Sequence, residues 1–254
     1  MPAPPWETGA DPPLPIWSGG GRPIPLTYPH LKQTLCITGT DTGVGKTVLT
    51  ALLASYLTGQ KIRVAAFKPM CSGGRADAEK IFAALAGALT LDEINPWHFH
   101  APIAPVLAAR RDRKSVRLAA VLAHLRALRK NFAVTLVEGA GGLLSPLGKD
   151  FDSRALIIAM RAAPIIVAPN QLGVVNHLRL TLAALPKNYR AQTKIVLMSP
   201  AQPNAATQTN ATLLGEFFPP EKIFTLPWLG KKFSAAEALK NLPVRRTLAA
   251  LVVV

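Results

Sequence analysis

The feature of this sequence that most limits its possible folds is the regular alternation of short apolar runs with longer helical patterns. The apolar runs are continuous, which is typical of strands whose two faces are both covered by helices. This alternation predicts an α/β fold in three layers, a mainly parallel sheet with helices on both faces, and ligands at the carboxyl ends of the strands. The expected strands are Thr34–Thr40, Arg63–Pro69, Val134–Val137, Ile165–Ala168, Lys194–Met198 and Lys222–Leu226. The expected helices are Lys46–Leu57, Ala76–Ala88, Ser115–Arg129, Ser153–Ala162, Val175–Leu185 and Ala206–Phe217.

The first 30 residues differ in composition from the rest of the chain. The stretch "MPAPPWETGADPPLPIWSGGGRPIPLTY" is rich in proline and glycine and has no apolar periodicity. Proline lacks an amide donor and fixes its own φ, so residues 1–30 are predicted to form an extended tail. Residues 31–254 are predicted to form one domain, long enough to bury a core without disulfide or metal staples.

The cysteines and the lengths of the apolar runs indicate in which cellular compartment the protein is expected. The two cysteines, Cys36 and Cys71, give neither a disulfide framework nor a metal-ligand spacing, so a reducing compartment is expected. No run has the length of a membrane span, and the N-terminus lacks the pattern of a secretory signal. We therefore expect a cytoplasmic protein without a membrane partner.

The formal net charge of +15 raises the question of a nucleic-acid partner. The basic residues are scattered, however, and no aromatic residues interleave with them as a stacking platform for bases would require. One group, Arg110, Arg111, Arg113 and Lys114, is expected in a loop. We interpret the charge as a solvated basic surface that raises the local concentration of anionic substrates.

The stretch "ITGTDTGVGKTVLTALLASYL", Ile37 to Leu57, has the order strand, glycine-bearing turn, helix. Such a turn can aim backbone N–H groups at a phosphate, and the helix that follows adds its free amides and the positive end of its dipole. Lys46 is then expected to reach the β- and γ-phosphates and Thr47 to hold Mg²⁺. The spacing between Gly39 and Gly45 is one residue longer than in the pattern G-x-x-x-x-G-K-[ST], which indicates a variant phosphate loop; a generic tight turn that contains Gly-Lys-Thr is the alternative.

A second group of polar residues follows the second expected strand, in "AFKPMCSGGRADAEK". Lys68 ends the strand and Pro69 stops it, so Lys68 is expected at the ligand edge, although a solvated lysine at a strand end is the plainer alternative. Ser72–Gly74 form a turn. Asp77 lies near the next helix start, where a metal ligand and a helix N-cap are both open interpretations.

A carboxylate follows the third strand, in "TLVEGAGGLLSPL". Glu138 comes directly after an apolar run, where a buried carboxylate needs a partner. A Mg²⁺ ion shared with Thr47 would provide one, because Mg²⁺ prefers carboxylate, hydroxyl and phosphate oxygens. The alternative is a glycine-rich turn, with Gly139, Gly141 and Gly142, beside a salt-bridged glutamate.

With these pieces in order, the chain resembles the dethiobiotin synthetase family from about Leu35 to Leu229. The matching blocks are "GTDTGVGKT", "KPMCSGG" with Asp77 following, "NPWHF", "VEGAGGLLSPL", "APIIVAPNQLGVVNHLRLT" and "LPWL". The resemblance implies a P-loop NTPase-like fold and an enzyme that uses ATP, Mg²⁺ and CO₂ to close a ureido ring on 7,8-diaminononanoate. It also implies a homodimer, in which residues of the Leu172–His177 segment help to bind the substrate tail across the interface.

The resemblance assigns roles residue by residue. Lys46 and Lys68 would be catalytic, and Thr47, Asp77 and Glu138 would share Mg²⁺. The substrate residues would be Ser72, Lys68, Leu172, Gly173 and Asn176. The ATP-binding residues would be Gly43, Val44, Gly45, Lys46, Thr47, Val48, Asp77, Glu138, Gly139, Ala140, Gly141 and, lining the base pocket, Pro227, Trp228 and Leu229.

The sequence departs from the family pattern at the periphery. Met198 and Ser199 stand where the family usually has an Asn-Asp pair that reads adenine, which predicts weak discrimination among nucleoside triphosphates. Ala104 and Val106 replace a serine and a histidine of the family segment "P-x-S-P-H-x-A-A".

Two other functions share parts of these motifs. Cobyrinic acid amidases usually add a glutaminase domain, for which this chain has no room. A nucleotide-dependent switch resembling the partition ATPases usually carries a further lysine early in the loop, where this chain has Thr40, Asp41 and Thr42. A divergent P-loop ATPase of this superfamily, acting as a switch or on another substrate, remains the alternative.

Overall fold

The computed structural model describes residues 33–252 and contains a six-stranded sheet in which every neighbouring pair of strands is parallel. The strand order is β2-β5-β1-β6-β7-β8. The strands are β1 (Gln33–Gly39), β2 (Val64–Phe67), β5 (Val134–Glu138), β6 (Ala163–Pro169), β7 (Lys194–Met198) and β8 (Ile223–Leu226). The six predicted strands are therefore confirmed, with small shifts of their ends. The predicted tail, residues 1–30, lies outside the described residues.

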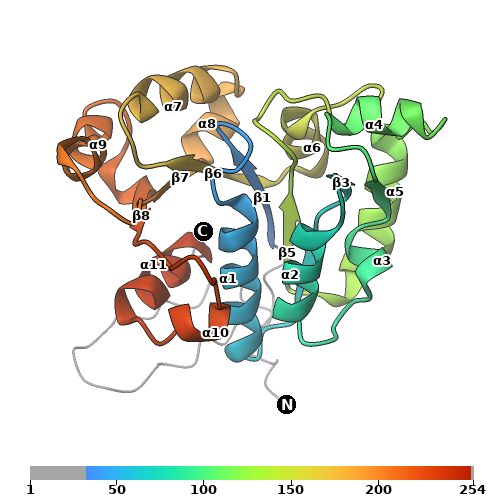
Figure 1. Ribbon diagram of the computed structural model, residues 1–254, viewed down its shortest axis with the longest axis horizontal. Helices are drawn as coiled ribbons and strands as arrows, with labels where there is room; N and C mark the ends of the chain where they lie inside the picture. Colours follow the sequence, from blue (N-terminus) through green and yellow to red (C-terminus); the bar gives the residue numbers. More distant parts are fainter. Residues whose placement is uncertain (1–32, 253–254) are drawn as a thin grey trace, which may run out of the picture.

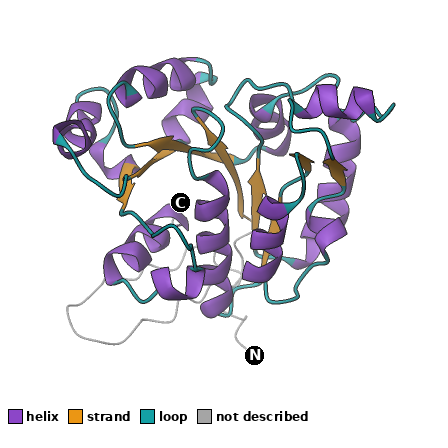
Figure 2. Ribbon diagram, in the orientation of Figure 1, coloured by secondary structure: helices purple, strands orange, loops and turns teal. Residues whose placement is uncertain are grey.

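Helices cover both faces of the sheet (Figures 1 and 2), as the continuous apolar runs predict. Figure 1 shows α1, α10 and α11 on one side of the sheet and α6, α7 and α8 on the other. The helices are α1 (Lys46–Gly59), α2 (Ala76–Ala84), α3 (Leu91–Ile94), α4 (Pro105–Arg111), α5 (Leu118–Leu128), α6 (Ser153–Met160), α7 (Val174–Ala183), α8 (Lys187–Gln192), α9 (Ala205–Gly215), α10 (Ala235–Ala238) and α11 (Leu242–Val252). Short 3₁₀ turns lie at Arg129–Asn131 and Pro220–Lys222. Within residues 33–252, none of these helices has the length and hydrophobicity needed to cross a membrane.

The central strand β1 shows how the sequence divides its side chains between the two layers. Leu35 and Ile37 are buried in a cluster that includes Leu52 of α1. Cys36, between them, is buried in a second cluster that includes Leu178 of α7. Successive side chains of a strand point to opposite faces, so an uninterrupted apolar run satisfies both layers at once.

The short helices α3, α4, α8 and α10, the C-terminal helix α11 and a second sheet were not predicted. A second, two-stranded parallel sheet pairs β3 (Met70–Ser72) with β4 (Trp97–Phe99). Three-residue strands are too short to give a periodic signal. The expected loop position of Arg110 and Arg111 was wrong, because both residues form the last turn of α4.

Candidate active site

A cavity of about 750 Å³ opens at the carboxyl edge of the sheet. Its lining comes from four separate segments: the glycine loop before α1, the segment from Lys68 to α2, the start of α4 and the glycine turn after β5. Parallel strands place their carboxyl ends at one edge, so segments distant in sequence meet there. The cavity is therefore at the position where a sheet of this topology binds ligands.

The glycine loop leads from β1 into α1. Gly45 is the N-cap of α1 and has φ 100°, a left-handed conformation that glycine adopts without strain. No side chain caps the helix, so its first N–H groups remain free to face a ligand. Gly43, Gly45 and Thr47 line the cavity.

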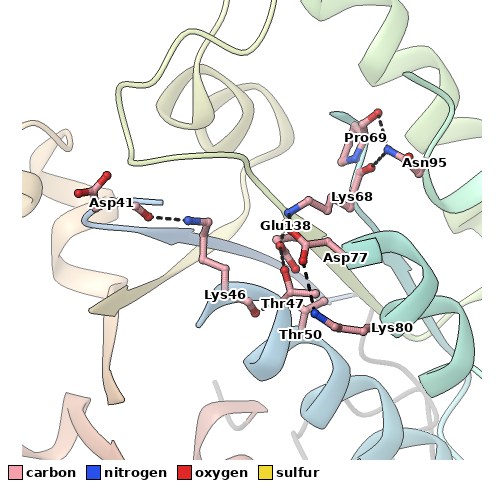
Figure 3. Close-up of polar contacts among 10 residues, drawn as sticks. All are labelled: Asp41, Lys46, Thr47, Thr50, Lys68, Pro69, Asp77, Lys80, Asn95 and Glu138. Atoms are coloured by element: carbon pink, nitrogen blue, oxygen red, sulfur yellow. Dashed lines mark hydrogen bonds and ion pairs between the residues drawn. The ribbon is translucent and has the colours of Figure 1, made fainter. Parts of the chain in front are cut away.

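Lys46, the first residue of α1, extends across the loop. Its side chain is buried, and its Nζ donates a hydrogen bond to the backbone oxygen of Asp41 at 2.6 Å (Figure 3). Burial lowers the pKa of Lys46 to about 8, with a further contribution from the positive charge of Lys68. Lys46 makes no ion pair with a carboxylate of residues 33–252, and a phosphate would favour its charged form.

Thr47, Lys68, Asp77 and Glu138 converge beside this loop (Figure 3). The Thr47 hydroxyl donates to Oε1 of Glu138 at 2.6 Å. Nζ of Lys68 lies 2.5 Å from the same oxygen and 3.0 Å from Oδ2 of Asp77. Glu138 ends β5 at a position that pairs with Ile37 of β1, so the sheet itself places the carboxylate next to the glycine loop.

The opposite charges in this cluster stabilise each other's ionised forms. Burial opposes the charged form of Lys68, but Glu138 and Asp77 outweigh it and hold the pKa of Lys68 above its ordinary value. Burial would raise the pKa of Asp77, but the charge of Lys68 outweighs it and lowers that pKa. Lys68 therefore keeps its charge at neutral pH, so it can stabilise an anion but cannot act as a general base.

Asn95 positions the backbone that carries Lys68. Its side chain is fully buried, and its Nδ2 donates to the backbone oxygen of Lys68 at 2.7 Å (Figure 3). The amide of Lys68 donates in turn to the backbone oxygen of Ile94. Sequence reasoning did not single out Asn95, although it begins the "NPWHF" block; the available signal was an asparagine directly after an apolar helix end.

The oxygen atoms of the cluster fit a magnesium ion. Oε2 of Glu138 is buried and has no hydrogen-bond partner among the described residues. Together with the Thr47 hydroxyl and the half-buried Asp77 carboxylate it offers hard oxygen donors, which Mg²⁺ prefers. Residues 33–252 contain no group of three or more His, Cys, Asp or Glu side chains placed to hold a metal. Mg²⁺ usually keeps several waters and takes further oxygens from phosphates.

The sequence of this chain is similar to those of known proteins. Residues 33–233 match the family described as "AAA domain". The chain is 40% identical over 167 residues to the ATP-dependent dethiobiotin synthetase BioD of Anaeromyxobacter sp. (strain Fw109-5), covering 64% of this chain and 75% of the relative. It is 37% identical over 199 residues to the protein of the same name from Anaeromyxobacter dehalogenans (strain 2CP-C), covering 76% of this chain and 89% of the relative. The chain belongs to the dethiobiotin synthetase family.

A solved structure supports the fold of this dethiobiotin synthetase family member. The structure titled "Structure of pNOB8 ParA bound to nonspecific DNA" matches with a TM-score of 0.55 over 87% of this chain and 97% of that chain. At 14% sequence identity the likeness shows the fold alone. The predicted P-loop NTPase-like fold is confirmed, and the family is one that uses ATP.

The predicted site residues of this family member fall into three places. Thr47, Lys68, Asp77 and Glu138 form the cluster described above. Asp77 is not a helix N-cap, because the N-cap of α2 is Arg75. Glu138 forms the salt bridge of the plainer alternative, with Lys68, and its second carboxylate oxygen has no partner among residues 33–252, so a metal ligand and a salt-bridged glutamate both remain open. Thr47, Lys68 and Asp77 of this cluster line the cavity, as do Gly43, Gly45, Lys46, Val48, Ser72, Ala140 and Gly141. Glu138 and the buried Val44 do not line it.

Gly139 does not line the cavity. A Cβ at Gly139 would lie 2.2 Å from Oγ of Ser153, so the close approach of α6 explains this glycine. The glycine turn after Glu138 therefore faces the cavity through Ala140 and Gly141.

The remaining predicted residues lie outside the cavity. Leu172, Gly173 and Asn176 are at the start of α7, and Leu172 is 85% exposed. Pro227, Trp228 and Leu229 follow β8, with Trp228 half exposed. The register of β7 and β8 places Leu226, directly before Pro227, beside Met198.

Met198 contacts the glycine loop. Its Cγ lies 3.0 Å from the position that a Cβ on Gly45 would occupy. An apolar side chain therefore packs against the N-terminus of α1, where the family pattern leads one to expect an amide.

Proposed function

We propose that this protein is an ATP-dependent dethiobiotin synthetase that acts on 7,8-diaminononanoate and CO₂ and releases ADP and phosphate. The observation that carries the proposal is the cluster in which Thr47 and Lys68 share Oε1 of Glu138 beside the glycine loop. The relatives are named as ATP-dependent dethiobiotin synthetases, which supports the use of ATP and dethiobiotin as the product.

The glycine loop would hold the triphosphate. The free N–H groups at the start of α1 and the ammonium of Lys46 would neutralise the phosphates, and Thr47, Asp77 and Glu138 would hold Mg²⁺. The ion would add positive charge at the phosphate oxygens. Ser72 and Lys68, with Ala140 and Gly141, would contact the diamine and its carbamate from the other side of the cavity.

The proposed reaction has three steps. One amine of the substrate attacks CO₂, forms an N–C bond and loses a proton, which gives a carbamate. A carbamate oxygen attacks the γ-phosphorus, the bond to the β-phosphate oxygen breaks, and ADP leaves. The second amine attacks the carbonyl carbon of the mixed anhydride, forms the second N–C bond and loses a proton, which closes the five-membered ring as the C–O bond to phosphate breaks and phosphate leaves.

Lys68 and Lys46 would act through charge and position. Phosphoryl transfer needs alignment of the reactants and stabilisation of the charge on the transferring group, and little covalent help from the protein. Lys68 is held charged by two carboxylates, so its ammonium is preorganised where the carbamate and the γ-phosphoryl group would meet. Asn95 would keep Lys68 in place by bonding its backbone oxygen.

The exposed start of α7 would belong to a dimer interface. Leu172 and, further along the helix, Leu180 are 85% and 64% exposed in the single chain. A symmetric dimer through this face would cover both leucines and bring Gly173 and Asn176 to the substrate of the partner subunit.

The free thiols of Cys36 and Cys71 are compatible with the proposed cytoplasmic location.

The proposal is tested by growth and by product formation. Expression of the wild-type chain should restore growth without biotin to a strain that lacks dethiobiotin synthetase, and Lys46→Ala and Lys68→Ala should not. Lys240→Ala is the matched control, because Lys240 pairs with Glu237 on the surface. Purified protein should incorporate labelled bicarbonate into dethiobiotin only when ATP and the diamine are both present. A well-folded wild-type protein that fails both tests would refute the proposal.

A further inference from the structure

A second, smaller hollow lies along α4 and the turn that follows it. It has a volume of about 200 Å³, and its lining contains three cationic residues, Arg110, Lys114 and Lys149, together with Ser115 and no carboxylate. None of the three cations makes an ion pair or a side-chain hydrogen bond within residues 33–252. The hollow is separate from the large cavity and shares no lining residue with it.

The backbone turn after α4 brings Arg110 and Lys114 together. The amide of Lys114 donates to the oxygen of Ala109 at 2.8 Å, and the amide of Arg113 donates to the oxygen of Arg110 at 3.0 Å. This is the hydrogen-bond pattern of a Schellman motif, whose left-handed position is usually glycine. Here Arg113 occupies it with φ 53°, a conformation that disfavours residues with a Cβ. The turn folds Lys114 back over the last turn of the helix.

A close approach of two loops adds Lys149. The amide of Lys149 donates to the oxygen of Val116 at 2.8 Å. A Cβ on Gly148 would lie 2.5 Å from that oxygen, so only glycine permits the contact. Neither of the neighbouring acids, Asp112 and Asp150, lines the hollow, and Oδ1 of Asp150 accepts from the amide of Leu118.

The three cationic side chains line one hollow and are solvent-exposed, and an anion placed among them would be attracted by all three. A hollow of this size accommodates a single tetrahedral oxyanion, with guanidinium, ammonium and hydroxyl groups as its donors. We propose that the hollow formed by Arg110, Lys114, Ser115 and Lys149 is a binding site for a small oxyanion of the phosphate class. The proposal does not depend on the reaction at the large cavity.

Titration with inorganic phosphate at constant ionic strength tests the proposal. Four full-length proteins are compared by calorimetry: wild type, the double variant Lys114→Gln with Lys149→Gln, the matched control Lys130→Gln with Lys187→Gln, and Lys46→Ala. The hollow variant should lose roughly tenfold in phosphate affinity for each charge-assisted hydrogen bond removed. The control, which loses the same charge from exposed positions elsewhere, should bind as wild type does, and Lys46→Ala should retain this binding.

The four proteins distinguish phosphate binding in the hollow from binding elsewhere on the protein. Equal loss in the control would mean general attraction to a basic surface, and loss in Lys46→Ala alone would mean that phosphate binds only at the glycine loop. Either result, or unchanged affinity in the hollow variant, would overturn the proposal.

Discussion

The pH dependence of nucleotide binding follows from the environment of Lys46. Its pKa is lowered to about 8 by burial and by the charge of Lys68. In the nucleotide-free protein Lys46 is thus about 90% charged at pH 7 and about 10% charged at pH 9. Phosphate oxygens favour the ammonium, so the bound form should keep its charge throughout this range. The affinity should fall about tenfold from pH 7 to pH 9, a loss of about 1.4 kcal/mol.

The assay is calorimetric titration with a non-hydrolysable ATP analogue at several pH values between 7 and 9.5. Near pH 8.5 binding should take up a proton, which appears as a dependence of the measured heat on the ionisation enthalpy of the buffer. Lys46→Arg is the control, since arginine stays charged throughout this range, and its affinity should not vary with pH. A wild-type affinity that stays constant up to pH 9.5 would refute the argument.

The contribution of Lys46 to the stability of the folded protein should change with pH in the opposite direction to its contribution to nucleotide affinity. A lysine whose folded pKa lies below its unfolded value binds fewer protons in the folded state between those two pKa values. The contribution of Lys46 to the free energy of unfolding should therefore become more favourable as pH rises from about 8 to about 10.4. Urea unfolding of wild type minus Lys46→Arg isolates this contribution, because Lys194, whose pKa is also lowered to about 8, is common to both proteins.

Three further predictions concern the cluster and the loop. Glu138→Gln should lower the free energy of unfolding in urea by about 2–4 kcal/mol, because it leaves the buried Lys68 with only one carboxylate; the double variant with Lys68→Met should recover part of this loss. Asn95→Ala should cost about 1–3 kcal/mol, because it leaves the buried oxygen of Lys68 without its donor, and should lower kcat more than it changes KM; unchanged kcat would contradict a positioning role. Wild type should show similar kcat/KM values for the four common nucleoside triphosphates, and Met198→Asn should favour ATP; a strong wild-type preference for ATP would show that other groups read the base.

The order of the elements could be predicted because it depends on local patterns. Continuous apolar runs predicted the six strands of the main sheet, and glycine followed by Lys46 and Thr47 predicted the start of α1 within one residue. The sheet of β3 and β4 could not be predicted, because each strand has three residues and its pairing is set by tertiary contacts. The position of Asp77 was left open between a cap and a ligand, and only the structure placed it beside Lys68.

By itself, the sequence determined the class of fold, the position of the glycine loop and the identity of the residues that end the strands. These features follow from the spacing of apolar residues and from the conformations open to glycine and proline, which are properties of neighbouring residues. Only the tertiary structure decided that Thr47 and Glu138, 91 positions apart, share a hydrogen bond, and that Lys68 lies between two carboxylates. The pKa values of Lys46 and Lys68 depend on these distances and on burial, and both arise only when the sheet assembles.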